Sequence, residues 1–159
     1  EAASRLLGDL VGEAQAAIAA VRRVVYDLRP PALDELGLVQ ALRQQCGRFP
    51  GLDVVVDAPG ELTRLPAAVE VAAFRIATEA VTNVARHSGA ETCVVRLSLN
   101  GALDLEITDD GRGLRDGWSP GVGVSSMRER AAELGGSCSI RSRRDGGTVL
   151  RAKLPVEPG

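Results

Sequence analysis

Cysteine and histidine, two of the residues that most often bind metals, are scarce in this chain of 159 residues. The cysteines are Cys46, Cys93 and Cys138, and the single histidine is His87. The cysteines are odd in number and far apart, without CxxC or Cys/His spacing, which argues against a zinc site or a disulfide framework. Each lies beside apolar residues, so we expect free, buried or half-buried thiols of a reducing cytosol.

Long apolar runs and an excess of basic charge are also missing. No run approaches the roughly 20 residues needed to cross a bilayer. No signal peptide is recognisable, and the chain starts at Glu1. We therefore expect a cytoplasmic piece of a larger protein, whose membrane attachment is left open. The net charge of −2 and the pI near 5.5 argue against nucleic-acid binding, so the arginines of 141–144 are expected to form a solvated edge.

The first thirty residues carry a heptad pattern. Its apolar positions, at alternating spacings of 4 and 3, are Leu7, Val11, Ala14, Ile18, Val21, Val25 and Leu28. This repeat is typical of the seam of a coiled coil or helical bundle. A single helix cannot bury such a seam alone, so it either packs on the rest of the chain or, as we favour, forms a dimer. The helix should stop at Pro30-Pro31, because proline cannot donate a helical hydrogen bond.

The rest of the chain predicts an α+β fold, and a hydrophobic content of 45% is enough for a core. Short segments come first: an amphipathic helix with its connector over 32–49, a strand over 52–58 and a turn over 58–62. A long helix over 65–88 follows, with Pro66 in its first turn. Apolar and polar residues then alternate over 92–100, 102–110, 137–143 and 148–155. Such strands have one wet face, so we expect a two-layer sandwich: a mixed, mostly antiparallel sheet with helices on one face.

Four polar residues recur at helical spacing in TEAVTNVARHS, and they are Glu79, Asn83, Arg86 and His87. At i, i+4, i+7 and i+8 they share one face of a helix. A carboxylate, an amide, a guanidinium and an imidazole in one row suit a phosphate-bearing ligand and its metal, since an amide oxygen is a hard ligand for Mg²⁺. A solvated helix face with a capping histidine is the alternative.

Glycines mark a second candidate site. DDGRG at 109–113 follows a strand, and GVG at 121–123 opens a helix over 124–135. Such glycines allow close approach of the backbone to a ligand and leave amides free for phosphate. The span between the two motifs, rich in Gly, Ser, Pro and Asp, is expected to be a lid. No GxxxxGK[ST] is present, which excludes a P-loop, and GRGLRDG lacks the third glycine of a dinucleotide fingerprint.

Taken in order, EAVTNVARHS, DDGRGL, GVGVSSMRERA and DGGTVLRAKLP resemble the four nucleotide-binding boxes of the GHKL (Bergerat) ATP-binding fold. The upstream DLRPPALDELGLVQAL, together with MRERAAELGG, is similar to sensor histidine kinases of the NarX/DesK type. Two positions depart from the usual pattern of that subfamily: Ser126 stands where a glycine usually precedes the Met, and Thr78 where Gln usually precedes the Glu.

The resemblance implies ATP and Mg²⁺ as ligands and assigns roles by position. Asn83 would coordinate Mg²⁺, with Glu79 in its water network, and these two would be the catalytic residues. Asp109 would accept the adenine amine, and Thr148 would support the adenine pocket. The other implied nucleotide-binding residues are the phosphate neighbours Arg86 and His87, the loop glycines Gly111 and Gly113, and the lid hinges Gly121 and Gly123.

The resemblance also implies an organisation and partners. Residues 1–30 would be the second helix of a dimerisation hairpin, 31–60 a junction helix and first strand, and 61–159 the rest of the catalytic domain. The phosphoacceptor histidine would lie on the first helix of that hairpin, which these residues do not contain, so the piece alone is not expected to autophosphorylate. The full-length kinase would be a homodimer and pass the phosphoryl group to a response regulator. The alternatives are another GHKL ATPase, an anti-sigma serine kinase, or a non-catalytic nucleotide-binding or dimerisation module.

Overall fold

A computed structural model describes residues 1–60, 62 and 64–157, together with the side chains of all these residues except 22–27. The side chain of the predicted seam position Val25 and the predicted turn residue Glu61 therefore lie outside the part of the chain that the structure describes. The chain divides into two compact units, residues 1–31 and 32–159.

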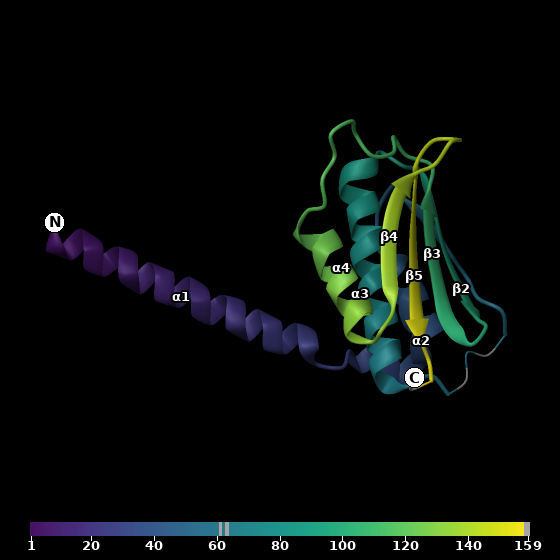
Figure 1. Ribbon diagram of the computed structural model, residues 1–159, viewed down its shortest axis with the longest axis horizontal. Helices are drawn as coiled ribbons and strands as arrows, with labels where there is room; N and C mark the ends of the chain where they lie inside the picture. The colour runs from purple at the N-terminus through teal and green to yellow at the C-terminus, as the bar shows by residue number, and fades with distance from the viewer. Residues whose placement is uncertain (61, 63, 158–159) are drawn as a thin grey trace. The chain divides into compact units, whose positions relative to one another are not determined.

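The first unit is the helix α1, Ala2–Asp27 (Figure 1). It ends just before Pro30-Pro31, as the prolines predict. Four predicted seam residues, Leu7, Val11, Ile18 and Val21, are each more than half exposed. None of the described helices is both long and apolar enough to cross a membrane.

The helix α2, Pro31–Cys46, starts at the last residue of the first unit and continues into the second, and it is two helical segments joined at Gly37. Gly37 has φ 75°, a left-handed conformation that breaks the helix and favours glycine. The elements that follow are β1 (Asp53–Asp57), α3 (Ala67–Asn83), the π-helical turn η1 (Val84–Ser88), β2 (Thr92–Leu99), β3 (Ala102–Asp109), α4 (Val122–Glu133), β4 (Ser137–Ser142) and β5 (Thr148–Pro155). Pro66 lies one residue before the first turn of α3, at the N-cap position.

The five strands form one sheet in the order β1-β2-β3-β5-β4. β1 pairs with β2 in parallel, and the other three pairs are antiparallel. Figure 1 shows α3 and α4 on one side of this sheet, and both contact its strands. The predicted α+β sandwich with helices on one face is confirmed.

The core lies between that inner sheet face and the helices. Alternate strand residues point into it, and they include Val95, Leu97, Leu103, Leu105 and Ile107, none more than 2% exposed. From α3 come Ile76, Ala77 and Val81, all fully buried. The alternation predicted from the sequence therefore puts the apolar side of each strand against helices, which is the largest source of folding free energy in this unit.

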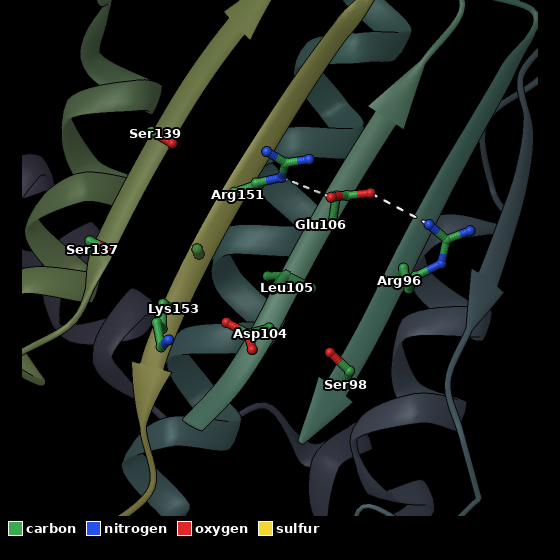
Figure 2. A pocket seen from close by; sticks show the side chains of 10 residues that line it. Arg96, Ser98, Asp104, Leu105, Glu106, Ser137, Ser139, Arg151 and Lys153 are labelled. Atoms are coloured by element: carbon green, nitrogen blue, oxygen red, sulfur yellow. Dashed lines mark hydrogen bonds and ion pairs between the residues drawn. The ribbon is translucent and has the colours of Figure 1, made fainter. Parts of the chain in front are cut away.

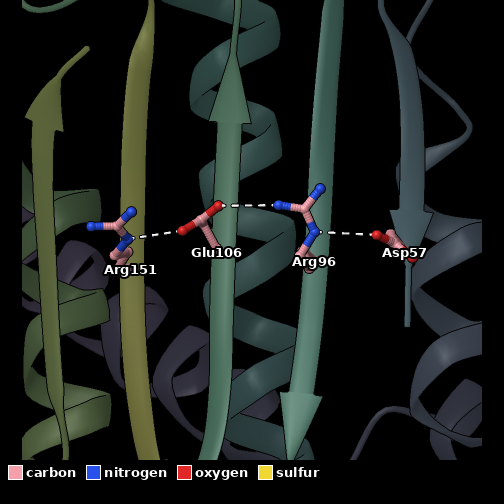
Figure 3. A network of polar contacts seen from close by, with 4 residues as sticks. All are labelled: Asp57, Arg96, Glu106 and Arg151. Carbon is pink, nitrogen blue, oxygen red and sulfur yellow. Dashed lines mark hydrogen bonds and ion pairs between the residues drawn. The ribbon is translucent and has the colours of Figure 1, made fainter. Parts of the chain in front are cut away.

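The outer face of the sheet carries a row of opposite charges across four strands (Figure 3). Arg96 contacts Asp57 at 3.2 Å and Glu106 at 3.5 Å, and Arg151 contacts Glu106 at 2.8 Å. Three residues of this row, Arg96, Glu106 and Arg151, line a depression of about 430 Å³, shown in Figure 2. The arginine side chains are 55% exposed, so each pair contributes at most about 1 kcal/mol to stability.

We predict that Leu105→Ala lowers the free energy of unfolding by about 2–5 kcal/mol, because the side chain is 1% exposed and its loss leaves a cavity. Leu99→Ala, on the adjacent strand at a site that is 40% exposed, is the matched control and should cost less than about 1 kcal/mol. Urea unfolding measures both. Equal losses for the two variants would contradict this placement of the core.

The three cysteines are free thiols, as predicted, with Cys46 and Cys93 buried and Cys138 half-buried. Burial raises the pKa of Cys46 to about 11. Burial, followed by the charge of Asp109, raises the pKa of Cys93 to about 12. Since the folded pKa values exceed the ordinary 9.0, the unfolded chain releases these protons first, and this contribution to stability is lost as the pH rises from about 9 to 12.

We predict that iodoacetamide at pH 8.5 modifies Cys138 in the folded chain well before Cys46 or Cys93, because the thiolate is the reactive form and access is needed. In urea the three should react at similar rates. Mass spectrometry of digested protein gives the three rates. Rapid modification of Cys93 in the folded chain would contradict its burial.

Candidate functional site

Asp109, at the end of β3, is a buried carboxylate, only 2% exposed. The hydroxyl of Thr148 donates a hydrogen bond to its Oδ2, and the N–H of Gly111 donates to its Oδ1 at 2.8 Å. Burying a charge is costly unless it is hydrogen-bonded, and here each oxygen has a donor. The sequence-predicted residues Asp109, Gly111 and Thr148 therefore meet in one place.

Glycines let three segments meet at this carboxylate. A Cβ on Gly147, where φ is +86°, would lie 1.9 Å from the carbonyl oxygen of Asp109. A Cβ on Gly111 would lie 2.5 Å from the carbonyl oxygen of Ser88. Contacts this short exclude any side chain at either position. The strand-end loop, the β4–β5 hairpin and the end of η1 therefore pack backbone against backbone around Asp109.

Glu79 and Asn83 lie one turn apart on α3, and both are half-buried. The start of α4 comes directly against them: a Cβ on Gly123 would lie 2.5 Å from Glu79 Oε1 and 3.4 Å from Asn83 Nδ2. Gly121, by contrast, has open space around its Cβ position. The structure thus brings Gly123 together with the predicted catalytic pair and leaves Gly121 at an open N-cap.

Beyond Asn83 the helix is not α-helical. Residues 84–88 form the π turn η1, whereas the sequence predicted an α-helix through 88. A π turn bonds i to i+5, so Arg86 and His87 do not continue the row of Glu79 and Asn83 at α-helical spacing. Both are exposed. Single π turns inside helices are frequent at functional sites, but no simple sequence pattern marks them.

DDGRG also carries contacts that sequence reasoning missed. Asp110 Oδ1 accepts the N–H groups of Glu91 and Thr92, both at 2.9 Å. These bonds lower the pKa of Asp110, with the bond from Thr92 as the largest cause. Arg143 donates to the carbonyl oxygen of Asp109 at 3.1 Å. An Asp beside a strand end is a common turn residue, which is the signal that could have indicated the role of Asp110.

The span between β3 and α4 contains no helix or strand. Gly113 adopts φ +77° and lies close to Ser142, whose hydroxyl accepts the N–H of Leu114 at 2.9 Å. Trp118 packs part of its surface on the core. Val122, the first residue of α4, is 89% exposed. That this span acts as a lid stays a prediction.

The oxygen donors at the site decide which metal ion it could bind. Among the described residues no group of three or more His, Cys, Asp or Glu side chains could hold a metal ion. Glu79 and Asn83 supply hard oxygen donors, which fit a cation that takes its other ligands from water and from a bound phosphate. That is the usual behaviour of Mg²⁺, so the residues present are compatible with it.

The fold and the buried carboxylate define a class of protein, a two-layer sandwich with a candidate ligand site near the ends of α3 and β3 and the start of α4. A family model for histidine kinase-, DNA gyrase B-, and HSP90-like ATPases matches residues 68–158. The chain belongs to this family, and it is accordingly an ATP-binding domain of the kind found in sensor histidine kinases.

Similar proteins are sensor histidine kinases. Sensor histidine kinase MctS of Rhizobium johnstonii is 40% identical over 87% of this chain and 32% of its own length. Sensor histidine kinase LiaS of Bacillus subtilis is 33% identical over 97% of this chain and 43% of its own length. The chain thus spans well under half of these relatives. The ATP-binding domain of PrrB from Mycobacterium tuberculosis shares the fold, with a TM-score of 0.59, 24% identity, and coverage of 76% of this chain and 93% of that one.

We predict that Thr148→Val lowers the free energy of unfolding by about 1–3 kcal/mol, because it leaves a buried carboxylate oxygen without its donor while keeping a β-branched side chain in β5. Thr148→Ser keeps the hydroxyl and should cost clearly less. Urea unfolding distinguishes the two variants. An equal loss in both would show that packing, rather than the hydrogen bond, explains the effect.

Proposed function

We propose that this chain is the catalytic part of a sensor histidine kinase, which presents the γ-phosphoryl group of Mg·ATP to a histidine on another helix. The observation that carries the proposal is that the candidate site has a group of polar residues at each of its two ends. Buried Asp109 with Thr148 forms one end, and Glu79 with Asn83 against Gly123 forms the other. A base-reading carboxylate and a metal-binding amide are the two contacts that an ATP site needs.

At the first end, Asp109 would accept a hydrogen bond from the adenine amine. Thr148 supports this role because its hydroxyl already holds Oδ2 in place, so the carboxylate does not reorganise on binding. Gly111 and Gly113 would let the loop pass close to the nucleotide. Guanine presents a carbonyl where adenine has the amine, so it would face an acceptor and be rejected.

At the second end, Asn83 Oδ1 would hold Mg²⁺, with Glu79 acting through a bound water. When bound, this cation neutralises charge on the phosphates. Arg86 and His87 lie on the following turn, where their donors would face phosphate oxygens. Gly121 and Gly123 would hinge the lid. These residues bind and orient the nucleotide, which is most of what phosphoryl transfer asks of a protein.

The transfer would break the bond between the γ-phosphorus and the bridging oxygen of ADP and form a bond to an imidazole nitrogen. His87 is not the acceptor on this proposal, because it lies one turn beyond Asn83 at the nucleotide itself. The acceptor would lie on the partner of α1 in a two-helix dimerisation hairpin. Residues 1–30 would then be the second helix of that hairpin, 31–60 the junction, and 61–159 the rest of the catalytic domain.

The exposed seam of α1 supports this assignment, because Leu7, Val11, Ile18 and Val21 are each more than half exposed. A homodimer of the full-length kinase would bury them in a helical bundle. A response regulator would then accept the phosphoryl group onto an Asp.

We predict that saturating Mg·ATP, at about 100 times its Kd, stabilises the chain by about 2.7 kcal/mol and raises its melting temperature by several degrees. Asn83→Ala should abolish most of this shift. Asn100→Ala removes the same side chain from the exposed turn between β2 and β3, and should keep the full shift. Differential scanning fluorimetry with and without Mg·ATP measures all three.

An unshifted melting temperature for the unaltered chain, or an equal shift in Asn83→Ala, would overturn the proposed site. The transfer itself is tested by adding a helix that carries a phosphoacceptor histidine. Acid-labile, base-stable radioactive phosphate should then appear on that helix, and its absence despite ATP binding would mark a non-catalytic module.

A further inference from the structure

The end of η1 is closed by a residue from another part of the chain. The last carbonyl groups of a helix have no helical partner and need donors from elsewhere. Gly89 ends this helix in the left-handed conformation, with φ 65°. The Ser88 hydroxyl bonds inside the same turn, donating to the Val84 carbonyl at 2.6 Å and accepting the N–H of Ala90 at 3.0 Å. The carbonyls of His87 and Ser88 still require partners.

Arg112 supplies both of these donors. Its backbone N–H donates to the Ser88 carbonyl at 3.0 Å, and its Nη2 donates to the His87 carbonyl at 3.0 Å. The guanidinium lies over the helix end, since a Cβ on Gly89 would be 3.6 Å from its Nε. A cation at this end of a helix is also favoured by the helix dipole. One residue of DDGRG therefore closes the turn that carries Arg86 and His87.

The same loop holds the base-reading carboxylate. Asp109 lies three residues before Arg112, and the tight contact of Gly111 with Ser88 leaves no room between the loop and the helix end. On the other side of η1, Asn83 immediately precedes the turn. The bonds of Arg112 thus join the residues proposed for the adenine end to those proposed for the phosphate end.

We propose that Arg112 is a positioning residue for phosphate binding: by holding the carbonyl end of η1 it keeps Asn83 and His87 at a set distance from Asp109. This inference rests on the proposed ATP site and adds a residue that acts through others. Without its side chain, the π turn would open more often, and the phosphate end would lose order while Asp109, still bonded by Thr148 and Gly111, would not.

The test combines amide hydrogen exchange without nucleotide and binding by calorimetry, for Arg112→Ala in the 159-residue chain. We expect exchange across 84–90 to be about tenfold faster, because one charge-assisted hydrogen bond is lost, with strand amides at 93–97 unchanged. We expect the Kd of Mg·ATP to rise about tenfold and that of adenosine to change less than twofold. Arg112→Lys, which keeps a donor for the His87 carbonyl, should recover part of both effects.

Arg144→Ala is the matched control, because it removes the same charge from an exposed position in the β4–β5 turn. It should behave as the unaltered chain in both measurements. Unchanged exchange with weaker ATP binding would make Arg112 a direct phosphate ligand and overturn the inference. Faster exchange with unchanged ATP binding would also overturn it, because Arg112 would then be only a structural cap of the helix. If the unaltered chain binds no ATP, the proposed function fails as well, whereas normal ATP binding in Arg112→Ala overturns only this inference.

Discussion

The arrangement of this domain depends on one buried charge. Asp109 ends a strand in an otherwise apolar layer, and its carboxylate is tolerated there because Thr148 and Gly111 each donate to one oxygen. Gly111 lies in the loop just after β3, whereas Thr148 begins β5, so the carboxylate ties β3 both to β5 and to its own loop. The cost of leaving the carboxylate without a donor keeps these segments together.

Close contacts between backbone segments around that carboxylate also fix the positions of the neighbouring helix ends. Gly147 and Gly111 have no room for a side chain because backbone atoms lie there, and Gly123 lies against the side-chain carboxylate of Glu79. The missing side chains allow the loop, the hairpin, the end of η1 and the start of α4 to approach one another. A site that binds a nucleotide along its length needs such fixed separations, because misplacing either end weakens the binding of the whole ligand.

The two faces of the sheet differ in what they contact. The inner face is apolar and packs against α3 and α4, so it sets the position of the site residues. The outer face carries the row from Asp57 to Arg151, whose charges balance and whose side chains are hydrated. Pairs of this kind add little stability. The depression along that row contains none of the residues proposed for the nucleotide.

Most elements follow from local pattern. Alternation of apolar and polar residues predicted the strands, and Pro30-Pro31 predicted the end of α1. The ordered motifs predicted a set of candidate site residues. Sequence pattern missed the π turn at 84–88, the break at Gly37 and the N-cap position of Pro66. It also missed Asp110, Arg112 and Arg143, because their partners lie 18 to 34 residues away and no periodicity records such pairings.

The physical reason why the sequence predicted some features and missed others is the range of the interactions along the chain. Side-chain alternation, proline and glycine act within a few residues, so the order of elements, the wet and dry faces of each strand and the candidate residues could be read along the chain. The meeting of Asp109 with Thr148, of Gly123 with Glu79, and of Arg112 with the end of η1 depends on how the sheet and helices pack. Those contacts exist only in the folded chain, and they bring residues of separate motifs together in the candidate site.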